Sequence, residues 1–486
     1  MKVLILNPPY FPRYSRTSRS PAVTHGGTIY YPFWLASAVG VLENSGFEVK
    51  FIDAPADGLD RKKVVQIAKE FQPELIVIET STPSIENDIE VLESIKTELK
   101  REITPFTVLV GTHVSATPDE SIKKSGMIDA IARREYDYII KDLAIALRDK
   151  KDISTVRGLT YRKDGKITNN PDMPPIENLD ELPFISEVYK KHLNIRKYFF
   201  SAALFPMVMI ITGRGCPHRC FFCNYPQVFS GRRYRLRTAE NVVAEFEYIV
   251  KNMPDVKEVA IEDDTLTADL DRVKKICRLM IQKGLNKKLR WYANTRVNLD
   301  YESMVLMKEA GCHLLIAGYE SGVQEILNNT KKGITLEQSR EFAKNTKKAG
   351  ILVHGCFIFG LPGDTKETIQ KTLSFAKELS PDTAQFFPLM PYPGTEAYQW
   401  AKEKGYLNAK TYKDWLIKDG HHNTVIDTPE LSAKDLIDEC DKARKDFYLR
   451  PKYIFYKLKQ MTKDPKEITR TAKSIKPFFK HLFLKK

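Results

Sequence analysis

Short, almost wholly apolar segments alternate with longer amphipathic ones through the first 150 residues. The apolar segments are too short for helices and contain many β-branched residues, which is typical of strands buried on both faces. They cover residues 3–6, 49–52, 75–78, 107–110 and 128–132. Helices are predicted at 32–45, 60–71, 85–100, 118–125 and 136–148. This alternation predicts an α/β domain with a doubly wound, Rossmann-like parallel sheet.

A second alternation follows a polar, proline-containing segment. Its strands are predicted at 207–212, 258–261, 290–293, 313–317, 352–359 and 383–388. Helices are predicted at 238–252, 269–284, 301–310, 335–349 and 364–379. Successive β/α units indicate a partial or full TIM-like barrel. We therefore divide the chain into a first domain (1–150), a linker (151–205), a barrel (206–405) and a helical C-terminal extension (406–486).

Composition limits the class of protein. The 486 residues are 42% hydrophobic and 28% charged, a globular mixture that excludes disordered, collagen-like and coiled-coil chains. No apolar stretch reaches the roughly 20 residues that a membrane span needs, and the opening apolar run is too short for a secretion signal. Seven unevenly spaced cysteines do not suit a disulfide framework. These features predict a cytoplasmic protein whose clustered cysteines bind metal or act in catalysis.

Three cysteines stand directly after the first predicted barrel strand. Cys216, Cys220 and Cys223 have the spacing C-x3-C-x2-C, and such thiolates suit zinc or an iron–sulfur cluster. A [4Fe–4S] cluster usually takes four cysteines, so three leave one iron open to bind another molecule. A zinc site completed by His218 or by a distant residue is the alternative. The position favours catalysis, because barrel enzymes place their chemistry at the carboxyl ends of the strands.

The cysteine motif, with Phe222 before its last cysteine, resembles the signature of the radical SAM superfamily. The resemblance implies that Cys216, Cys220 and Cys223 are metal ligands and catalytic residues. It also implies that the open iron chelates S-adenosylmethionine and that its reductive cleavage gives a 5′-deoxyadenosyl radical. The electron would come from a donor such as flavodoxin or ferredoxin.

Segments at the ends of the later barrel strands resemble the same family. Residues 262–265 stand where the family has a Gly-Gly-Glu-like segment facing the amino group of S-adenosylmethionine. Residues 318–322 resemble its ribose and carboxylate contacts, and residues 359–363 lie near the expected adenine site. The implied contacts are Phe222, Glu262, Asp263, Asn294, Arg296, Glu320, Ser321, Phe359 and Gly360.

A parallel α/β domain ahead of such a barrel resembles the cobalamin-binding subfamily, and ligands of these sheets bind beyond the strand ends. The cobalamin contacts implied there are Pro8, Pro9, Thr80, Ser81, Thr82, Gly111, His113 and Glu135. The Asp-x-His-x-x-Gly motif for a cobalt-ligating histidine is absent, since Gly111 stands two residues before His113. Cobalamin is therefore expected without a protein histidine on cobalt. Arg134 departs from the subfamily, which commonly has glycine there.

The C-terminal tail carries most of the excess charge. Residues 450–486 contain 12 basic and two acidic residues, while the whole chain has a net charge of +14. Lysines alternate there with aromatic and aliphatic residues, which predicts a basic amphipathic helix. Three settings suit such a helix: packing on the barrel, an anionic membrane surface, and nucleic acid. Packing and the membrane surface are favoured about equally, and nucleic acid is the least favoured. The expected location is cytoplasmic, and peripheral attachment to the inner membrane face stays open.

Together these patterns favour an enzyme, a radical SAM protein that uses a [4Fe–4S] cluster, S-adenosylmethionine and cobalamin. Residues 216–237 resemble the hopanoid-biosynthesis type, which implies a lipid- or isoprenoid-like substrate that is methylated, rearranged or ring-contracted at an unactivated carbon. Two alternatives stay open. One is a zinc-stabilised nucleic-acid-binding protein, and the other is a radical SAM enzyme whose first domain is purely structural.

Overall fold

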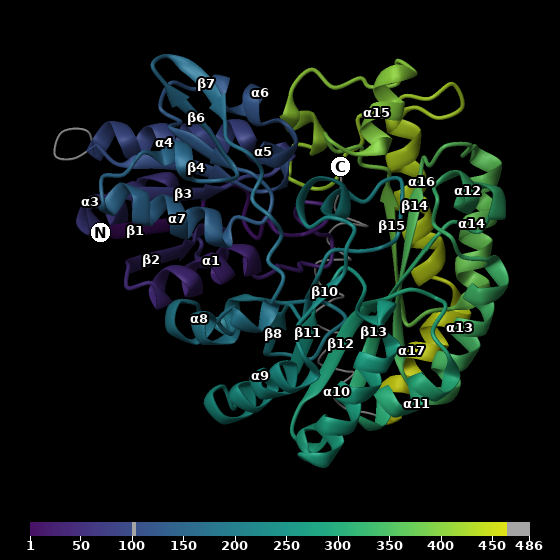
Figure 1. The fold of residues 1–486 in the computed structure, drawn as a ribbon. Coiled ribbons are helices and arrows are strands. Elements are labelled where there is room, and N and C mark those ends of the chain that lie inside the picture. The colour runs from purple at the N-terminus through teal and green to yellow at the C-terminus, as the bar shows by residue number, and fades with distance from the viewer. Residues whose placement is uncertain (100–103, 464–486) are drawn as a thin grey trace.

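The computed structural model describes residues 1–99 and 104–463 and contains two large sheets lying side by side (Figure 1). The first sheet has the strand order β2-β1-β3-β4-β5-β6-β7. Its strands are β1 Lys2–Asn7, β2 Glu48–Asp53, β3 Leu75–Glu79, β4 Phe106–Val110, β5 Ala130–Ala132, β6 Leu159–Lys163 and β7 Lys166–Asn169. The helices of this part are α1 Phe33–Asn44, α2 Ala54–Asp57, α3 Arg61–Phe71, α4 Ile85–Leu99, α5 Thr112–Ala116, α6 Pro118–Lys123 and α7 Asp137–Arg148.

Strand β1 shows why these segments are apolar throughout. Val3 and Ile5 belong to a core that includes residues of α1 and α7. Leu4 and Leu6 point to the opposite face, into a second core with residues of α3 and α4. Successive side chains of a strand alternate between faces, so a sheet covered on both sides needs apolar residues at every position. The predicted Rossmann-like fold is confirmed.

The second sheet has the order β15-β14-β13-β12-β11-β8, with every pair parallel. Its strands are β8 Met207–Ile210, β11 Glu258–Ile261, β12 Arg290–Thr295, β13 Cys312–Glu320, β14 Leu352–Phe359 and β15 Thr383–Pro388. The helices that accompany it are α9 Ala239–Asn252, α10 Leu270–Gln282, α11 Tyr301–Glu309, α12 Gln324–Asn329, α13 Leu336–Ala349 and α14 Lys366–Leu379. In the described part of the chain β8 and β15 do not pair with each other, so the barrel is partial.

Three α-helices follow β15 within the described residues 389–463, and α16 covers the open edge of the barrel at this strand. These helices are α15 Glu396–Glu403, α16 Ala433–Tyr448 and α17 Pro451–Lys463. Arg444 donates to the carbonyl of Phe386 at 2.7 Å, and the amide of Ala384 donates to the hydroxyl of Tyr448 at 2.8 Å. Side chains of α16 thus satisfy backbone groups of a strand edge that would otherwise be free to pair with another chain.

The segment expected to be a linker differs from the prediction. It contains α8 Ile185–His192 and a hairpin, β6–β7, that extends the first sheet beyond β5 in antiparallel fashion. The hairpin turns at Asp164 and Gly165, whose φ angles are +51° and +75°. An Asp-Gly pair between two short strands favours such a turn, because both positions need left-handed backbone. This local signal was present in the sequence and was outweighed by the polar composition around it.

The tail forms the predicted basic helix over Pro451–Lys463, and the remainder of the tail, 464–486, lies outside the described residues. Within the described ranges, every helix is too short or too polar to cross a bilayer.

Candidate active site

The cysteine loop follows β8 and a short strand, β9 (Gly213–Arg214), which pairs with β10 (Arg235–Leu236). Gly215 has a φ of +87°, and a Cβ there would lie 2.2 Å from the carbonyl oxygen of Arg233, so only glycine fits this turn. The amide of Cys216 then donates to the carbonyl of Gly231 at 3.1 Å, and that of Cys223 to the carbonyl of Cys220 at 3.2 Å. These backbone bonds hold the three cysteines on one compact loop at the carboxyl-terminal ends of the barrel strands.

The three thiols are free and share one electrostatic environment. Burial raises the pKa of Cys216 to about 11, and burial together with the Asp264 carboxylate and the Cys220 thiolate raises that of Cys223. Arg296 brings a compensating charge, with Nη1 3.8 Å from the sulfur of Cys220. Across the described chain, no three His, Cys, Asp or Glu side chains are close enough to hold a single metal ion. Three soft thiolates beside a cation suit an iron–sulfur cluster, which is ligated at separate corners.

Asp263 has a different role from the one expected. Its Oδ1 accepts the amides of Thr212 and Gly213 at 2.6 and 2.9 Å. Its Oδ2 accepts the hydroxyls of Thr212 and Tyr234 at 2.6 and 3.0 Å. With four donors already bound, this carboxylate is a structural clamp on the strand that leads into the cysteine loop, and it has no capacity left for S-adenosylmethionine.

An Asp263→Ala variant should lower the free energy of unfolding by about 2–3 kcal/mol, because buried donors lose their acceptor. Iron content after anaerobic reconstitution should fall with it, since the clamp fixes the cysteine loop. Urea unfolding and iron analysis measure both effects. The exposed Asp271→Ala on α10 is the control, and equal behaviour of the two variants would contradict the clamp.

Glu262, by contrast, keeps an unused acceptor. Its carboxylate is buried, and Oε2 receives Arg19 Nη1 at 3.4 Å and Asn294 Nδ2 at 3.3 Å. Its Oε1 has no hydrogen-bond partner among the described residues, and neither do Asn224 Oδ1 and Ser18 Oγ. Buried polar atoms without partners mark a place where a polar ligand or water belongs. The amino-acid end of S-adenosylmethionine fits such a set.

Arg19 was missed by the sequence prediction. It belongs to the segment that follows β1, yet its guanidinium reaches the barrel and donates to the backbone carbonyls of Glu262 and Asp263 at 3.1 and 3.0 Å. It also lies 3.4 Å from the Asp264 carboxylate. No local motif marks this arginine, because its partners are more than 240 residues away in the sequence.

The other predicted contacts fall into two groups. Glu320, at a φ of +63°, pairs with Lys332 at 2.6 Å and lines the cavity described below, as do Phe222 and Asn294. Ser321 instead bonds Thr372 and the amide of Val323. Phe359 and Gly360 are buried behind the strand ends, where Asp364 accepts the amide of Gly360 at 2.9 Å.

A cavity of about 640 Å³ begins at the cysteine loop and runs along the inner face of the barrel. Arg19, Cys223, Asn224 and Glu320 line its inner end. The rest of its wall is largely apolar. The apolar residues there include Phe200, Ile316, Ile358, Phe386, Phe387, Leu389 and Met390.

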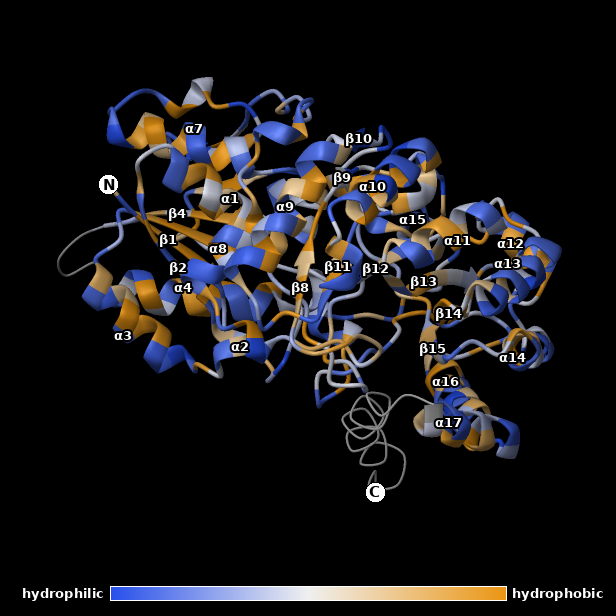
Figure 2. Cartoon of the chain, turned by 90° about the horizontal axis from the view of Figure 1, so that it is seen from below, coloured by the Kyte–Doolittle hydropathy of each residue, from blue (hydrophilic) through white to orange (hydrophobic). Residues whose placement is uncertain are grey.

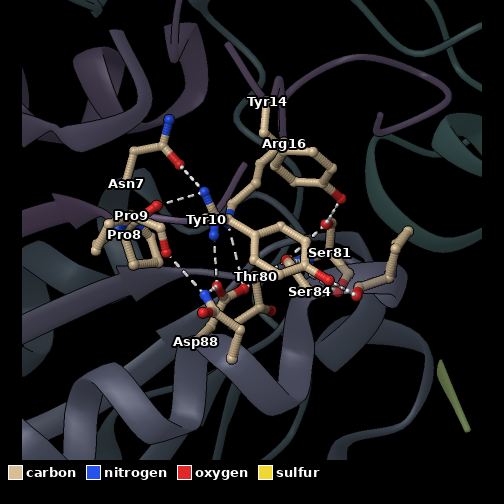
Figure 3. Close-up of polar contacts among 12 residues, drawn as sticks. Asn7, Pro8, Pro9, Tyr10, Tyr14, Arg16, Thr80, Ser81, Ser84 and Asp88 are labelled. Atoms are coloured by element: carbon tan, nitrogen blue, oxygen red, sulfur yellow. Dashed lines mark hydrogen bonds and ion pairs between the residues drawn. The ribbon is translucent and has the colours of Figure 1, made fainter. Parts of the chain in front are cut away.

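The expected cobalamin edge of the first sheet is filled by the protein itself (Figure 3). Arg16 inserts there and binds the carboxylate of Asp88, with Nη2 2.5 Å from Oδ1, and it donates to the carbonyl of Pro8 at 2.6 Å. Tyr14 bonds Ser81 at 2.8 Å. The predicted contacts Thr80, Ser81 and Thr82 are consequently buried. The side chains at this edge satisfy one another, so a corrin ring could lie there only beyond these residues or after displacing them.

His113 is also occupied within the protein. Its Nδ1 lies 3.1 Å from Thr82 Oγ1, its Nε2 lies 3.4 Å from Thr117 Oγ1, and Tyr412 packs against the ring. Burial lowers the pKa of His113 to about 3. Both ring nitrogens have partners, which agrees with the expectation that this histidine does not ligate cobalt.

The remaining predicted contacts are backbone positions and an interdomain carboxylate. Gly111 has a φ of +117°, and a Cβ there would lie 2.3 Å from the carbonyl of Thr80. Arg134 keeps a left-handed φ of +63° despite not being glycine. Glu135 pairs with Arg235 and with Arg214, both from the barrel. Glu135 therefore joins the two domains.

Comparisons with known proteins agree with both domains. The radical SAM superfamily model matches residues 210–376, and the B12 binding domain model matches residues 19–144. An uncharacterized methyltransferase from Pyrococcus horikoshii is 33% identical over 455 residues, 93% of this chain and 94% of the relative. An anaerobic magnesium-protoporphyrin IX monomethyl ester cyclase from Rubrivivax gelatinosus is 27% identical, over 94% of this chain and 80% of the relative.

Solved structures show the same fold. The radical S-adenosylmethionine methyltransferase TsrM from Kitasatospora setae, with cobalamin and a [4Fe–4S] cluster bound, has a TM-score of 0.70 at 19% identity and covers 93% of this chain and 89% of its own. The cobalamin-dependent S-adenosylmethionine radical enzyme OxsB has a TM-score of 0.71 at 16% identity, and the match covers 98% of this chain and 72% of OxsB. The domain order, the cysteine loop and these relatives together show that the chain belongs to the cobalamin-dependent radical SAM enzymes.

Proposed function

We propose that this enzyme modifies an unactivated carbon of an apolar, lipid- or isoprenoid-like substrate bound in the 640 Å³ cavity. The observation that carries the proposal is the position of this cavity, whose largely apolar wall includes Cys223. When bound, the cluster and S-adenosylmethionine supply a hydrogen-abstracting radical, and cobalamin supplies a carrier for a methyl group. The product would be methylated, rearranged or ring-contracted.

The residues of this chain would hold and orient the reactants. The free Oε1 of Glu262 is placed to accept from an ammonium group, and the guanidinium of Arg19 beside it is suited to a carboxylate. Arg296 balances negative charge at Cys220. The apolar walls exclude water, which protects a reactive radical from side reactions.

Most charged side chains of the cavity wall are paired with an opposite charge. Glu320 is paired with Lys332, and Asp441 with Arg444. Burial lowers the pKa of His354, which also lines the cavity, to about 4, so this imidazole is neutral near pH 7. A neutral wall favours an apolar substrate over a charged one.

The experiment is incubation of the anaerobically reconstituted enzyme with S-adenosylmethionine, a reductant, cobalamin and candidate lipid extracts, followed by product mass. Formation of 5′-deoxyadenosine with a lipid that gains one methylene, or that is isomerised, supports the proposal. Turnover only with charged, water-soluble compounds would contradict it.

Glu262→Gln should weaken S-adenosylmethionine binding by about 10- to 100-fold, because a charge-assisted hydrogen bond contributes about 1.5–3 kcal/mol. Equilibrium dialysis under anaerobic conditions measures the dissociation constant. Glu403→Gln, an exposed position on α15, serves as the control. Unchanged affinity in Glu262→Gln would remove this residue from the binding site.

A further inference from the structure

The outer end of the cavity opens beside α17. Leu449, Ile454 and Leu458 line the cavity, and they are also 40%, 47% and 56% exposed to solvent. A side chain that belongs to a cavity wall and is exposed at the same time stands at the cavity's mouth. The exposed side chains at the mouth are therefore apolar, and α17, which carries two of them, lies at the edge of the molecule next to α16 (Figure 2).

The three sides of α17 have different surroundings. One side is anchored to Asp382, whose carbonyl accepts from Tyr453 and whose Oδ1 accepts from Gln460, both at 2.8 Å. A second side, residues 454, 457, 458 and 461, borders the cavity, and Tyr453 lines it as well. The third side carries Lys452, Phe455 and Lys459, which helical spacing places together. Phe455 is 71% exposed.

Exposed large hydrophobic side chains gather in this one region. Within the described residues they are Leu449, Ile454, Phe455, Tyr456 and Leu458. Contiguous exposed apolar side chains mark an interaction surface. Basic residues accompany them, since the described segment 450–463 contains five basic residues and no acidic one. Aromatic and aliphatic side chains bordered by lysines match an anionic bilayer, whose headgroups attract the lysines while its acyl region takes up the apolar groups.

We infer that α17 seats the enzyme on an anionic lipid surface with the mouth of the cavity facing the bilayer, so that an apolar substrate enters without crossing water. This inference rests on the proposed apolar substrate and adds the route by which it arrives. The anchoring of α17 on Asp382 fixes the mouth relative to the inner end at Cys223. The same helix would thus bind the lipid surface and border the opening through which the substrate enters.

The test is sedimentation of the full-length protein with vesicles of phosphatidylglycerol and phosphatidylcholine, compared with vesicles of phosphatidylcholine alone. We expect stronger binding to the anionic vesicles, weakened by salt. Phe455→Glu should reduce the partition coefficient by about tenfold or more, because it places a negative charge at the centre of the surface. Lys62→Glu introduces the same acidic side chain at an exposed position of α3, at the far side of the first domain, and should bind nearly as the wild type does.

A second measurement locates the mouth. Tryptophan emission in a Leu458→Trp variant should be quenched by brominated lipid beyond the background of the four native tryptophans, and emission in Lys62→Trp should not. The inference is overturned if the wild type ignores anionic vesicles, if Phe455→Glu binds them equally well, or if an RNA duplex binds and displaces them. Formation of 5′-deoxyadenosine in the absence of vesicles should be the same in Phe455→Glu and the wild type. If neither the wild type nor Phe455→Glu forms 5′-deoxyadenosine, the result counts against the proposed function and not against the membrane inference.

Discussion

Cys220→Ala should abolish reductive cleavage of S-adenosylmethionine, with 5′-deoxyadenosine at the level of an enzyme-free control. The loss is expected to be complete because a cluster needs every one of its protein thiolates. Cys220 also lies on the loop that Asp263 clamps through its contacts with Thr212 and Gly213. The backbone bonds that shape the loop do not involve the Cys220 sulfur, so the fold should persist.

Iron analysis and the absorption of the reconstituted, oxygen-free protein measure the cluster, and chromatography of the reaction measures 5′-deoxyadenosine. Cys277→Ala is the matched control, since Cys277 is buried in α10 within the hydrophobic core. We expect this control to keep its iron and its activity, with only a small loss of stability. Full activity in Cys220→Ala, or wild-type protein with one zinc and no iron, would contradict the cluster assignment and favour the zinc alternative.

Patterns that are local in the sequence predicted the local structure well. The apolar runs located the five parallel strands of the first sheet and the six of the barrel, because burial on both faces requires apolar residues at every position. The predicted strand at 128–132 is shorter in the structure, where β5 spans Ala130–Ala132. The cysteine motif and the acidic residues after β11 could also be recognised in the sequence, since the residues of each are close together in the chain.

Contacts between residues far apart in the sequence could not be predicted from it. The carboxylates of Glu262 and Asp263 are adjacent in sequence, yet one keeps a free acceptor and the other is saturated by Thr212, Gly213 and Tyr234. Only the packing of distant loops distinguishes them. The filling of the strand-end edge by Arg16 is of the same kind, because its partner Asp88 lies 72 residues away and neither residue belongs to a motif.

The second large effect is expected at this buried ion pair. Arg16→Met should lower the free energy of unfolding by about 3–5 kcal/mol, because it leaves a fully buried carboxylate without its charge partner. The side chains of Arg16 and Asp88 both have zero exposure. Arg61→Met removes an exposed ion pair to Glu90, 2.7 Å apart, and should cost less than about 1 kcal/mol. Urea unfolding followed by circular dichroism measures both variants.

The loss of stability in Arg16→Met should depend on pH in a defined direction. Burial raises the pKa of Asp88 even with Arg16 in place, and loss of the guanidinium raises it further. The folded variant then binds a proton that the unfolded chain releases near its ordinary pKa of about 4. Stability therefore falls as the pH rises from about 4 through the folded pKa. The free energy of unfolding of Arg16→Met should therefore fall further below that of the wild type at pH 8 than at pH 5.

A double variant separates the ion pair from the packing of the segment. Arg16→Met combined with Asp88→Leu replaces both charges by apolar groups and should recover a large part of the loss, because a buried pair is often replaceable by hydrophobic residues of similar volume. Recovery would show that the cost of the single variant lies in the unpaired carboxylate. An Arg16→Met variant that unfolds like Arg61→Met at both pH values would show that Arg16 does not hold residues 10–17 on the strand ends.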